Sequence, residues 1–235
     1  MSGKTTASER TREALILAGE RLFGEQGIDG VSLRQINTAA GQKNSSAAHY
    51  HFGSKDALLQ AVFEYRLSRV NTRRMKMLEQ LSADGREKDV RAIVETIVYP
   101  IVEEIHESEG GSHYIRFLAQ MAGHPQISLA SLWSSKFAES LATVIQLLKN
   151  ALPGVPERLL GQRFGLMWEQ TIHALADREK LSKSGADNEE FAGSIALPLF
   201  VSNLVDTVAG GLAANVSPET LAEMQTKKKA SKSKA

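Results

Sequence analysis

The sequence contains no cysteine, and this absence excludes two kinds of stabilising or functional feature. Without thiols the chain has neither a disulfide framework nor a zinc centre with thiolate ligands. The first twelve residues are polar and lack the apolar segment of a secretion signal, so we expect a cytoplasmic protein. The 28 basic and 27 acidic residues leave a net charge of only +1, so the distribution of charge matters more than its total.

A long uninterrupted apolar run is also missing. The nearest approach is 195–214, which is almost long enough to span a bilayer but contains Pro198, Asn203 and Asp206. An unpaired Asp in hydrocarbon costs about 3 kcal/mol. We therefore interpret this segment as a buried helix, either in the core of a helical bundle or at a subunit interface.

The alternation of apolar and polar residues that marks a β-strand is absent, whereas apolar residues recur at three- and four-residue steps almost everywhere. This pattern predicts an all-α protein. The expected helices cover residues 14–22, 32–40, 45–51, 54–83, 90–107, 112–122, 129–150, 157–181 and 189–214, with a last short helix that begins at Ser217-Pro218.

Capping residues predict where the first two helices begin and end. Gly24 and Gly27 are expected to end the first helix. Ser32 and Gln35 form a capping box at the start of the second helix, in which each side chain accepts a hydrogen bond from the other residue's backbone N–H. Gly41 supplies the left-handed stop that ends this helix.

A third helix and a long fourth helix follow directly. Asn44 or Ser45 is expected to cap the third helix, which ends at Gly53. Ser54 then caps the fourth. Two short helices that are joined by a turn with glycine and supported by an earlier helix are typical of a helix-turn-helix unit. The second helix of such a unit enters the major groove of DNA.

Small polar side chains crowd the third helix, and DNA recognition explains their presence. Ala47 and Ala48 allow the helix to pack closely on its neighbours. The side chains expected to face base edges or phosphates are Lys43, Asn44, Ser45, Ser46 and His49. A Ser- and Asn-rich segment also occurs in surface loops, so these residues alone leave a plain loop as the alternative.

The stretch 12–64 resembles the DNA-binding domain of the TetR family of transcriptional regulators. The residues that carry the resemblance are the helix 14–23, the run Gly27-Ile28-Asp29-Gly30-Val31-Ser32-Leu33-Arg34, the pair Ala40-Gly41, and above all Tyr50-His51-Phe52-Gly53-Ser54-Lys55-Asp56-Ala57-Leu58-Leu59. The resemblance implies that the rest of the chain forms a helical ligand-binding and dimerising domain, in agreement with the all-α pattern.

The resemblance also implies contacts with DNA. Lys55 and either Tyr50 or His49 match family positions that contact phosphates. Ser32 and Lys55 lie at expected helix N-termini, where free N–H groups and the helix dipole favour an anion. The full expected DNA-binding set is Ser32, Arg34, Lys43, Asn44, Ser45, Ser46, His49, Tyr50 and Lys55. The segment between Gly41 and Phe52 is one residue longer than the commonest family pattern, which leaves the register of the third helix open by one position.

The other ring-bearing residues of this segment are assigned structural roles. We expect Phe52 to pack between the third and fourth helices rather than on a base, and His51 to support the turn. His49 and His51 lack the cysteine or carboxylate pair that completes a metal site, so no metal and no cofactor is expected.

Two apolar helices near the C-terminus are expected to pair with a second copy of the chain, because a four-helix interface about a two-fold axis covers their apolar surface. The expected dimer-interface residues are Phe164, Trp168, Ile172, Leu199, Phe200, Leu204 and Val208, with packing inside one subunit as the alternative for each. A dimer separates two reading helices by about 34–36 Å, one turn of DNA, as a palindromic operator requires.

Aromatic, Met and a few polar side chains lie between these two regions. Such a set is typical of a small-molecule pocket and equally of a helical core. The candidate ligand-binding residues are Tyr99, His106, Arg116, Phe117, Met121, Trp133, Phe137, Trp168 and His173. We expect a mostly apolar effector whose polar or anionic end is bound by Arg116 or His173.

Basic residues cluster in two segments. Arg66, Arg69, Arg73 and Arg74 are expected to solvate the outer face of the fourth helix. The lysine-rich stretch 227–235 is expected to be a disordered tail.

These patterns divide the chain into a helix-turn-helix domain, 1–56, a ligand-binding and dimerisation domain, 57–226, and the tail. They predict a DNA-binding repressor that a ligand releases by shifting the dimer between two shapes, with the fourth helix as the lever. The alternative is a DNA-binding or architectural protein that is controlled by a protein partner. No glycine-rich phosphate loop, nucleophile elbow or His–carboxylate arrangement is present in the sequence, so no enzyme is expected.

Overall fold

The computed structural model describes residues 6–44, 46–107, 111–124, 138–184 and 195–224, and within these ranges all regular secondary structure is helical. The all-α prediction is confirmed. The helices are α1 (Ala7–Gln26), α2 (Leu33–Ala39), α3 (Ala47–Phe52), α4 (Lys55–Ala83), α5 (Val90–Glu107), α6 (Gly111–Ala122), α8 (Ala138–Ala151), α9 (Glu157–Ser184) and α10 (Leu197–Ala213). A short helix, Pro218–Met224, follows α10.

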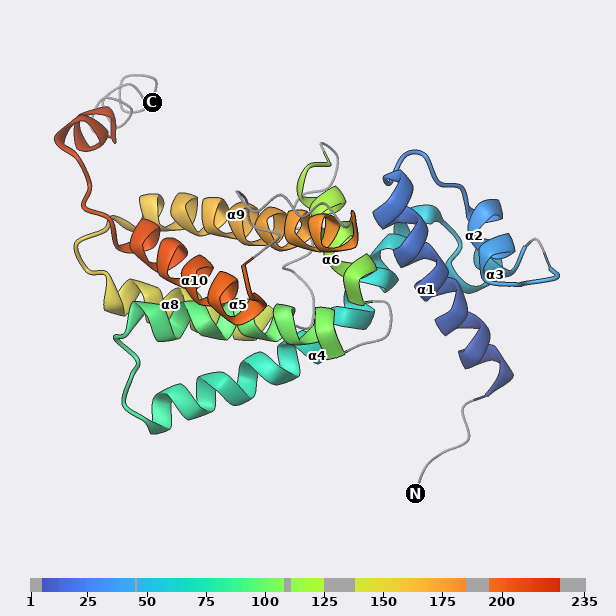
Figure 1. Ribbon diagram of the computed structural model, residues 1–235, viewed down its shortest axis with the longest axis horizontal. Coiled ribbons are helices and arrows are strands. Elements are labelled where there is room, and N and C mark those ends of the chain that lie inside the picture. Colours follow the sequence, from blue (N-terminus) through green and yellow to red (C-terminus); the bar gives the residue numbers. More distant parts are fainter. Residues whose placement is uncertain (1–5, 45, 108–110, 125–137, 185–194, 225–235) are drawn as a thin grey trace, which may run out of the picture.

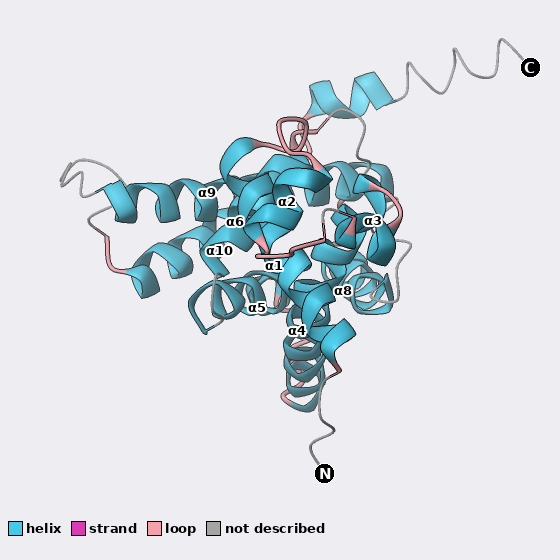
Figure 2. Ribbon diagram, turned by 90° about the vertical axis from the view of Figure 1, so that its right-hand side faces the viewer, coloured by secondary structure: helices cyan, strands magenta, loops and turns pink. Residues whose placement is uncertain are grey.

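The molecule has a small end and a large end (Figure 1). Helices α1–α3 form the small end, and α5, α8, α9 and α10 form a bundle at the other. Helix α4 packs against α1 and α3 and also against α5, so it belongs to both ends. Figure 2 looks at the molecule from the small end and shows α1, α2 and α3 in front of the bundle.

Helix α1 begins in a capping box that Thr6 and Glu9 form through their side chains and backbone N–H groups. Gly24, which was expected to help end this helix, lies inside it. A Cβ atom at Gly24 would lie 2.9 Å from the carbonyl oxygen of His113 on α6, so glycine is needed here for close packing between helices. The helix ends at Gln26, and Gly27 follows with a φ of 79°.

Helix α4 is the longest helix within the described residues and begins as predicted, with the Ala57 N–H donating to Ser54 Oγ at 3.1 Å. Its 29 residues span about 43 Å at 1.5 Å per residue. It ends at Ala83, and Gly85 reverses the chain with a φ of 66°. One rigid helix therefore connects the small end to the far side of the bundle.

The bundle surrounds α5, which packs against α4, α6, α8 and α10. The observed limits of α5 are the predicted ones, 90–107, and its buried residues include Ile93, Ile97 and Ile101. Helix α6 packs against both α1 and α9, so it is a second connection between the two ends.

Helix α10 starts later than the predicted 189–214. Ile195 and Ala196 precede the helix, and Pro198 lies in its first turn, where a residue without an N–H is tolerated. Residues 185–194 and the predicted helix start at 129 lie outside the described residues.

The interior of α10 is buried, as the sequence predicted, with Leu204, Val205 and Val208 in the core. Among the described residues no single helix has both the length and the apolarity to cross a membrane. Helix α10 and Pro218–Met224 meet those criteria only when they are taken together across a 58° bend.

Candidate nucleic-acid interface

Helix α2 is capped at both ends by the residues that the sequence predicted. The Gln35 N–H donates to Ser32 Oγ at 3.3 Å, and the Ser32 N–H donates to Gln35 Oε1 at 2.8 Å. After the helix, Gly41 takes a φ of 66°, in the left-handed region. The capping box and the glycine stop are both confirmed.

Helix α3 begins two residues later than predicted, at Ala47. Its N-cap is Ser46, whose side chain forms no capping hydrogen bond. Asn44 acts in the preceding turn instead, where its Oδ1 accepts a hydrogen bond from the Ser46 N–H at 2.9 Å. The capping role predicted for Asn44 is therefore wrong, and Ser45 lies outside the described residues.

Asn37 of α2 supplies the cap that α3 lacks locally. Its side chain is 2% exposed, and its Oδ1 accepts a hydrogen bond of 2.8 Å from the backbone N–H of Ala48. Ala48 is the second residue of α3, so its N–H has no partner within the helix. This bond fixes the position of α3 on α2. Sequence analysis missed Asn37, for which the only signal was a polar residue beside the apolar Ile36.

The polar face of α3 and the turn before it are open to solvent. Ala47 and Ala48 are buried against the neighbouring helices, whereas Tyr50 is 82% exposed. The predicted contact residues that the structure exposes are Ser32, Arg34, Lys43, Asn44, Ser46, His49 and Tyr50. They lie at the end of the molecule remote from the bundle (Figure 1), where a large partner has room to bind.

Lys55 differs from the other predicted contact residues because it is half-buried. Its Nζ lies 3.5 Å from the carbonyl oxygen of Asp29, in the turn between α1 and α2. Ser32 is already engaged as well, since its hydroxyl donates to Gln35 Oε1 at 2.7 Å. Any anion at these two helix N-termini must therefore be recognised largely by backbone N–H groups and by the tip of Lys55.

Phe52 is half-buried against the hydrophobic core, as expected, and the guanidinium carbon of Arg12 on α1 lies 5.2 Å from its ring centroid. The Tyr50 and His51 rings form a T-shaped pair, with 5.2 Å between their centroids and 84° between their planes. No group of three or more His, Asp or Glu side chains suited to a metal ion is found among the described residues.

A buried ion cluster joins the small end to α4 and the bundle. Arg66 of α4 donates from Nε and Nη2 to the two carboxylate oxygens of Glu20 on α1, both at 2.9 Å. Its Nη1 donates to Glu104 of α5 at 3.1 Å. Arg73 extends the cluster to Glu104 and Glu107. The expectation that these arginines solvate an outer face is wrong for Arg66 and Arg74, which are both buried.

The pKa values in this cluster reflect the competition between burial and pairing. Burial raises the pKa of the Glu20 carboxyl, and the hydrogen bonds and charge of Arg66 offset part of that rise. Burial disfavours the charged form of Arg66, but the hydrogen bonds and charges of Glu20 and Glu104 outweigh it and raise its pKa. The two-point contact between Arg66 and Glu20 is typical of a charged pair.

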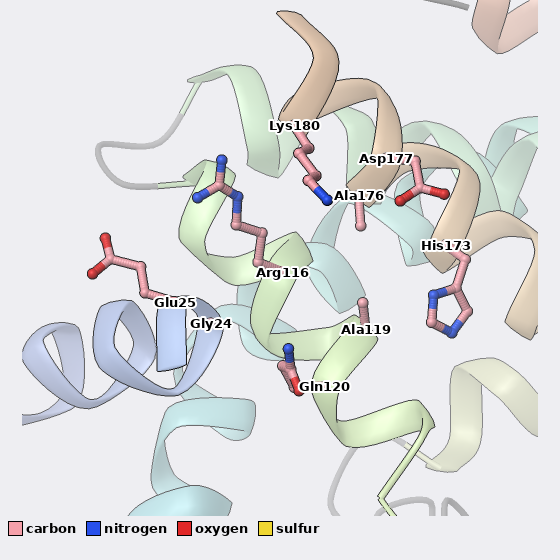
Figure 3. A pocket seen from close by; sticks show the side chains of 9 residues that line it. All are labelled: Gly24, Glu25, Arg116, Ala119, Gln120, His173, Ala176, Asp177 and Lys180. Atoms are coloured by element: carbon pink, nitrogen blue, oxygen red, sulfur yellow. The ribbon is translucent and has the colours of Figure 1, made fainter. Parts of the chain in front are cut away.

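The predicted ligand-binding residues separate into two groups. Phe117, Met121 and Trp168 are buried inside the bundle, with Tyr99 half-buried beside them. Arg116 and His173 instead line a cleft on the surface between α1, α6 and α9 (Figure 3). His106 faces Glu179 at 3.9 Å. Trp133 and Phe137 lie outside the described residues.

The predicted dimer residues are mostly interior. Phe164, Trp168, Ile172, Leu204 and Val208 are buried within one subunit. Their tight packing against α5, α6 and each other accounts for the apolar pattern. Leu199 is 63% exposed and Phe200 is half-buried. Leu166 of α9, which the sequence analysis did not select, is 70% exposed.

Comparisons with known proteins agree with this geometry. Residues 15–62 match the family model described as bacterial regulatory proteins of the tetR family, and residues 95–211 match the tetracyclin repressor-like C-terminal domain. The chain is 31% identical over 70 residues to the HTH-type transcriptional repressor NicS of Pseudomonas putida. This match covers 30% of the chain and 32% of NicS, about a third of that relative's length.

Solved structures show the same fold. NalD, the secondary repressor of the MexAB-OprM multidrug efflux pump in Pseudomonas aeruginosa, is 21% identical with a TM-score of 0.55, over 90% of this chain and all of NalD (100%). A protein described as a tetR family transcription regulator from Shewanella sp. PV-4 is 16% identical with a TM-score of 0.53, over 85% of this chain and 96% of its own. One family model matches the helix-turn-helix end and the other matches the bundle, so the chain belongs to the TetR family of transcriptional regulators.

Proposed function

We propose that this TetR-family regulator is a repressor that binds a palindromic duplex site as a homodimer and is released by a small effector. The observation that carries the proposal is the exposed polar face of α3. Two buried alanines and the Asn37–Ala48 hydrogen bond hold this face outward at the end of the molecule. The proposal that the protein represses rather than activates transcription is supported by NicS and NalD, which are both named as repressors.

The proposal keeps the division of the chain into a DNA-binding domain, 1–56, and a ligand-binding and dimerisation domain, 57–226. Helix α4 starts at that boundary, and the Glu20–Arg66–Glu104 cluster crosses it. A change in the bundle that moves α5 relative to α4 therefore acts on α1 through these ion pairs.

We place the releasing effector in the interior of the bundle. Trp168 Nε1 and Thr171 Oγ1, one turn apart on α9, are buried and have no hydrogen-bond partner among the described residues. Buried polar groups without partners are costly. A mostly apolar molecule with a hydrogen-bonding group at this point would satisfy both. A thermal-shift screen of lipophilic compounds tests this, and the proposed site is withdrawn if none of them raises the melting temperature.

The DNA-binding proposal is tested by selecting bound duplexes from a random pool and then measuring the affinity of the protein for the most enriched sequence. We expect Ser46→Ala to change the selected sequence, because an exposed side chain at the start of α3 would contact base edges and so specify bases. Lys55→Ala should weaken all sequences alike and reduce the slope of log affinity against log salt by about 1.

Lys88→Ala is the matched control for Lys55→Ala. It removes the same charge from an exposed position in the connection between α4 and α5, at the far end of α4. Affinity should be unchanged in this variant. If Lys88→Ala and Lys55→Ala weaken binding equally, or if Ser46→Ala leaves the selected sequence unchanged, the assigned roles are wrong.

The dimer proposal rests on the exposed apolar side chains of α9 and α10, Leu166 and Leu199. Leu199→Glu should shift the protein to monomers in sedimentation, because a charge then replaces an apolar contact. Leu221→Glu changes an exposed leucine of Pro218–Met224 and is the control. A wild-type protein that sediments as a monomer at all accessible concentrations contradicts the proposal.

A further inference from the structure

Arg12 of α1 lies against the end of α3. Its guanidinium carbon is 5.2 Å from the centroid of the Phe52 ring, and Phe52 is the last residue of α3. The two helices pack against each other at the small end of the molecule (Figure 1). Arg12 is exposed, so this contact leaves it open to solvent beside the helix proposed to read DNA. The sequence analysis did not include Arg12 among the expected DNA-binding residues.

The contact with Phe52 leaves the hydrogen-bonding capacity of Arg12 unused. A cation over an aromatic ring is attracted by the negative face of the ring, and this attraction requires no oxygen acceptor. A guanidinium carries five N–H donors. The Arg12 side chain forms no hydrogen bond or ion pair with any described residue. Its donors are therefore available to an anion outside the protein.

Arg69 of α4 shows how a similar arginine behaves when it serves the fold. Its guanidinium carbon also lies 5.2 Å from a ring centroid, that of Tyr65. In addition, its Nη1 lies 3.6 Å from the carboxylate of Glu104. Arg12 has the ring contact without a carboxylate among the described residues.

The carboxylates nearest to Arg12 along α1 are engaged elsewhere. Glu9, one turn earlier, accepts a hydrogen bond of 2.7 Å from the Thr6 N–H in the capping box. Glu13, the next residue, accepts a hydrogen bond from the Tyr65 hydroxyl of α4. Both carboxylates are thus held by partners other than Arg12.

The charges of the small end are equal in number but differ in their surroundings. Residues 6–56 contain as many acidic as basic side chains. Four of the carboxylates face groups of α4, of α6 or of the chain just after α6, and these are Glu13, Glu20, Glu25 and Asp29. Within the described residues no ion pair involves the basic side chains, which are Arg10, Arg12, Arg21, Arg34, Lys43 and Lys55. The position of Arg12 beside α3, and not the total charge, therefore distinguishes it.

We propose that Arg12 donates hydrogen bonds to a backbone phosphate of the duplex, beside the groove that α3 enters, and that the Phe52 ring holds it in place for this contact. The inference rests on the DNA-binding function proposed above and adds α1 to the surfaces that meet DNA. The planar donors of a guanidinium match the oxygens of a phosphate. A side chain that is already held loses less conformational entropy on binding.

The competing interpretation is that Arg12 only covers the Phe52 ring and keeps α3 in place. The salt dependence of binding separates the two roles. A charge that contacts a phosphate displaces counterions from DNA, so its loss lowers the slope of log affinity against log salt. A side chain that supports α3 without touching DNA leaves this slope unchanged.

Affinity for the most enriched duplex is measured by fluorescence anisotropy between about 50 and 200 mM salt. Arg12→Gln should weaken binding about tenfold, as the loss of a charge-assisted hydrogen bond predicts. The salt slope should fall by about 1 for each bound protomer. Arg12→Lys should keep the slope, because it keeps the charge, but bind less tightly because an ammonium lacks the planar fork.

Arg21→Gln is the matched control. Arg21 is an exposed residue of the same helix, nine residues further along. Nine residues are two and a half turns, so Arg21 points to the opposite side of α1. Both variants lose one positive charge, so an effect of total charge is the same in both. Arg21→Gln should bind within about twofold of the wild type, because solvent screens distant charges.

Phe52→Leu tests the role of the ring, because leucine keeps an apolar side chain at the edge of the core. In this background Arg12→Gln should weaken binding by a smaller factor than in the wild type, since the guanidinium is no longer held. The melting temperature of each variant without DNA shows whether it is folded. If Phe52→Leu does not fold, the two Arg12 variants decide the phosphate contact alone.

Equal losses of affinity in Arg12→Gln and Arg21→Gln overturn the inference and leave the proposed function intact. A wild-type salt slope in Arg12→Gln also overturns it. A change in the sequence selected by Arg12→Gln contradicts the phosphate contact as well, because phosphate contacts carry no sequence information. If the wild-type protein enriches no duplex, the proposed function itself fails, and the inference fails with it.

Discussion

Arg66 and Arg74 lie about two turns apart on α4, and both are 1% exposed, but their surroundings differ. Arg66 meets the carboxylates of Glu20 and Glu104 at the junction of α1, α4 and α5. Arg74 lies deeper in the bundle and donates to the Thr96 carbonyl oxygen and to Ser140 Oγ, each at 3.3 Å. In the described part of the chain Arg74 has no carboxylate within ion-pair distance.

The pKa values of the two arginines shift in opposite directions for this reason. The two carboxylates outweigh burial at Arg66 and raise its pKa, whereas burial lowers the pKa of Arg74 to about 10. A buried charge is tolerated when its pair is well arranged and is costly otherwise. The comparison teaches that α4 is held by paired charge where it meets α1 and α5. In the bundle it is held by packing, although the buried charge of Arg74 has no carboxylate partner among the described residues.

The largest expected effect on stability comes from breaking the buried Glu20–Arg66–Glu104 cluster. Arg66→Met leaves the buried carboxylates of Glu20 and Glu104 facing each other without their shared cation. We expect a loss of about 3–5 kcal/mol in the free energy of unfolding, measured by urea denaturation. Arg86→Met breaks an exposed pair with Asp89 and is the control, and its unfolding midpoint should stay close to that of the wild type. Equal losses of unfolding free energy in the two variants would show that the buried pair contributes no more to stability than the exposed one.

A smaller effect is expected at an exposed pair that also caps a helix. The hydrogen bond from the Ala92 N–H, followed by that from Arg86, lowers the pKa of Asp89 below its ordinary value of 3.8. Asp89→Ala should cost about 1 kcal/mol at neutral pH, the typical value of an N-cap. A lowered pKa stabilises the fold above pH 3.8, and this contribution is lost as the pH falls through the folded-state value. Wild type and Asp89→Ala should therefore converge in acid, as urea titrations at several pH values can establish.

Arg69 tests the edge of the paired cluster. Its side chain is 47% exposed and its Nη1 lies 3.6 Å from Glu104, so solvent screens most of the attraction. Arg69→Gln should cost between about 0 and 1 kcal/mol, and the difference should shrink further in salt. A loss as large as that of Arg66→Met, or one insensitive to salt, would show that Arg69 belongs to the buried cluster.

The smallest loss, or a gain, is expected at the unpaired arginine. Arg74→Met keeps most of the apolar volume and removes a buried charge that lacks a carboxylate. We expect a free energy of unfolding within about 1 kcal/mol of the wild type or above it. A loss of several kcal/mol, similar to that of Arg66→Met, would contradict the comparison and assign Arg74 a structural role through Thr96 and Ser140.

Local signals allowed much of the fold to be predicted. The limits of α5, the capping box of Ser32, the stop at Gly41 and the cap at Ser54 all agree with the structure. Each depends on hydrogen bonds or apolar spacing within a few residues, which a sequence displays directly. The family of the chain was also recognisable, because residues 50–59 carry its motif.

Other features depend on residues that are distant in the sequence. Gly24 was taken for a helix end, but the carbonyl oxygen of His113 on α6 explains why it is a glycine. The arginines of α4 were assigned to a solvated face, because the carboxylates of α1 and α5 that bury Arg66 are not its neighbours along the chain. The expected interface residues of α9 and α10 proved mostly interior for the same reason.

By itself the sequence determined which segments are helical, where most of them begin and end, and which short helix carries a cluster of small polar side chains. Backbone hydrogen bonding and helical periodicity act over four residues or fewer, so they can be read locally. Only the tertiary structure decided that Asn37 caps α3, that Arg66 is paired while Arg74 is not, and that Arg116 and Lys180 border one cleft. These outcomes depend on which helices pack together, because burial and charge compensation arise from contacts between segments that are far apart in the chain.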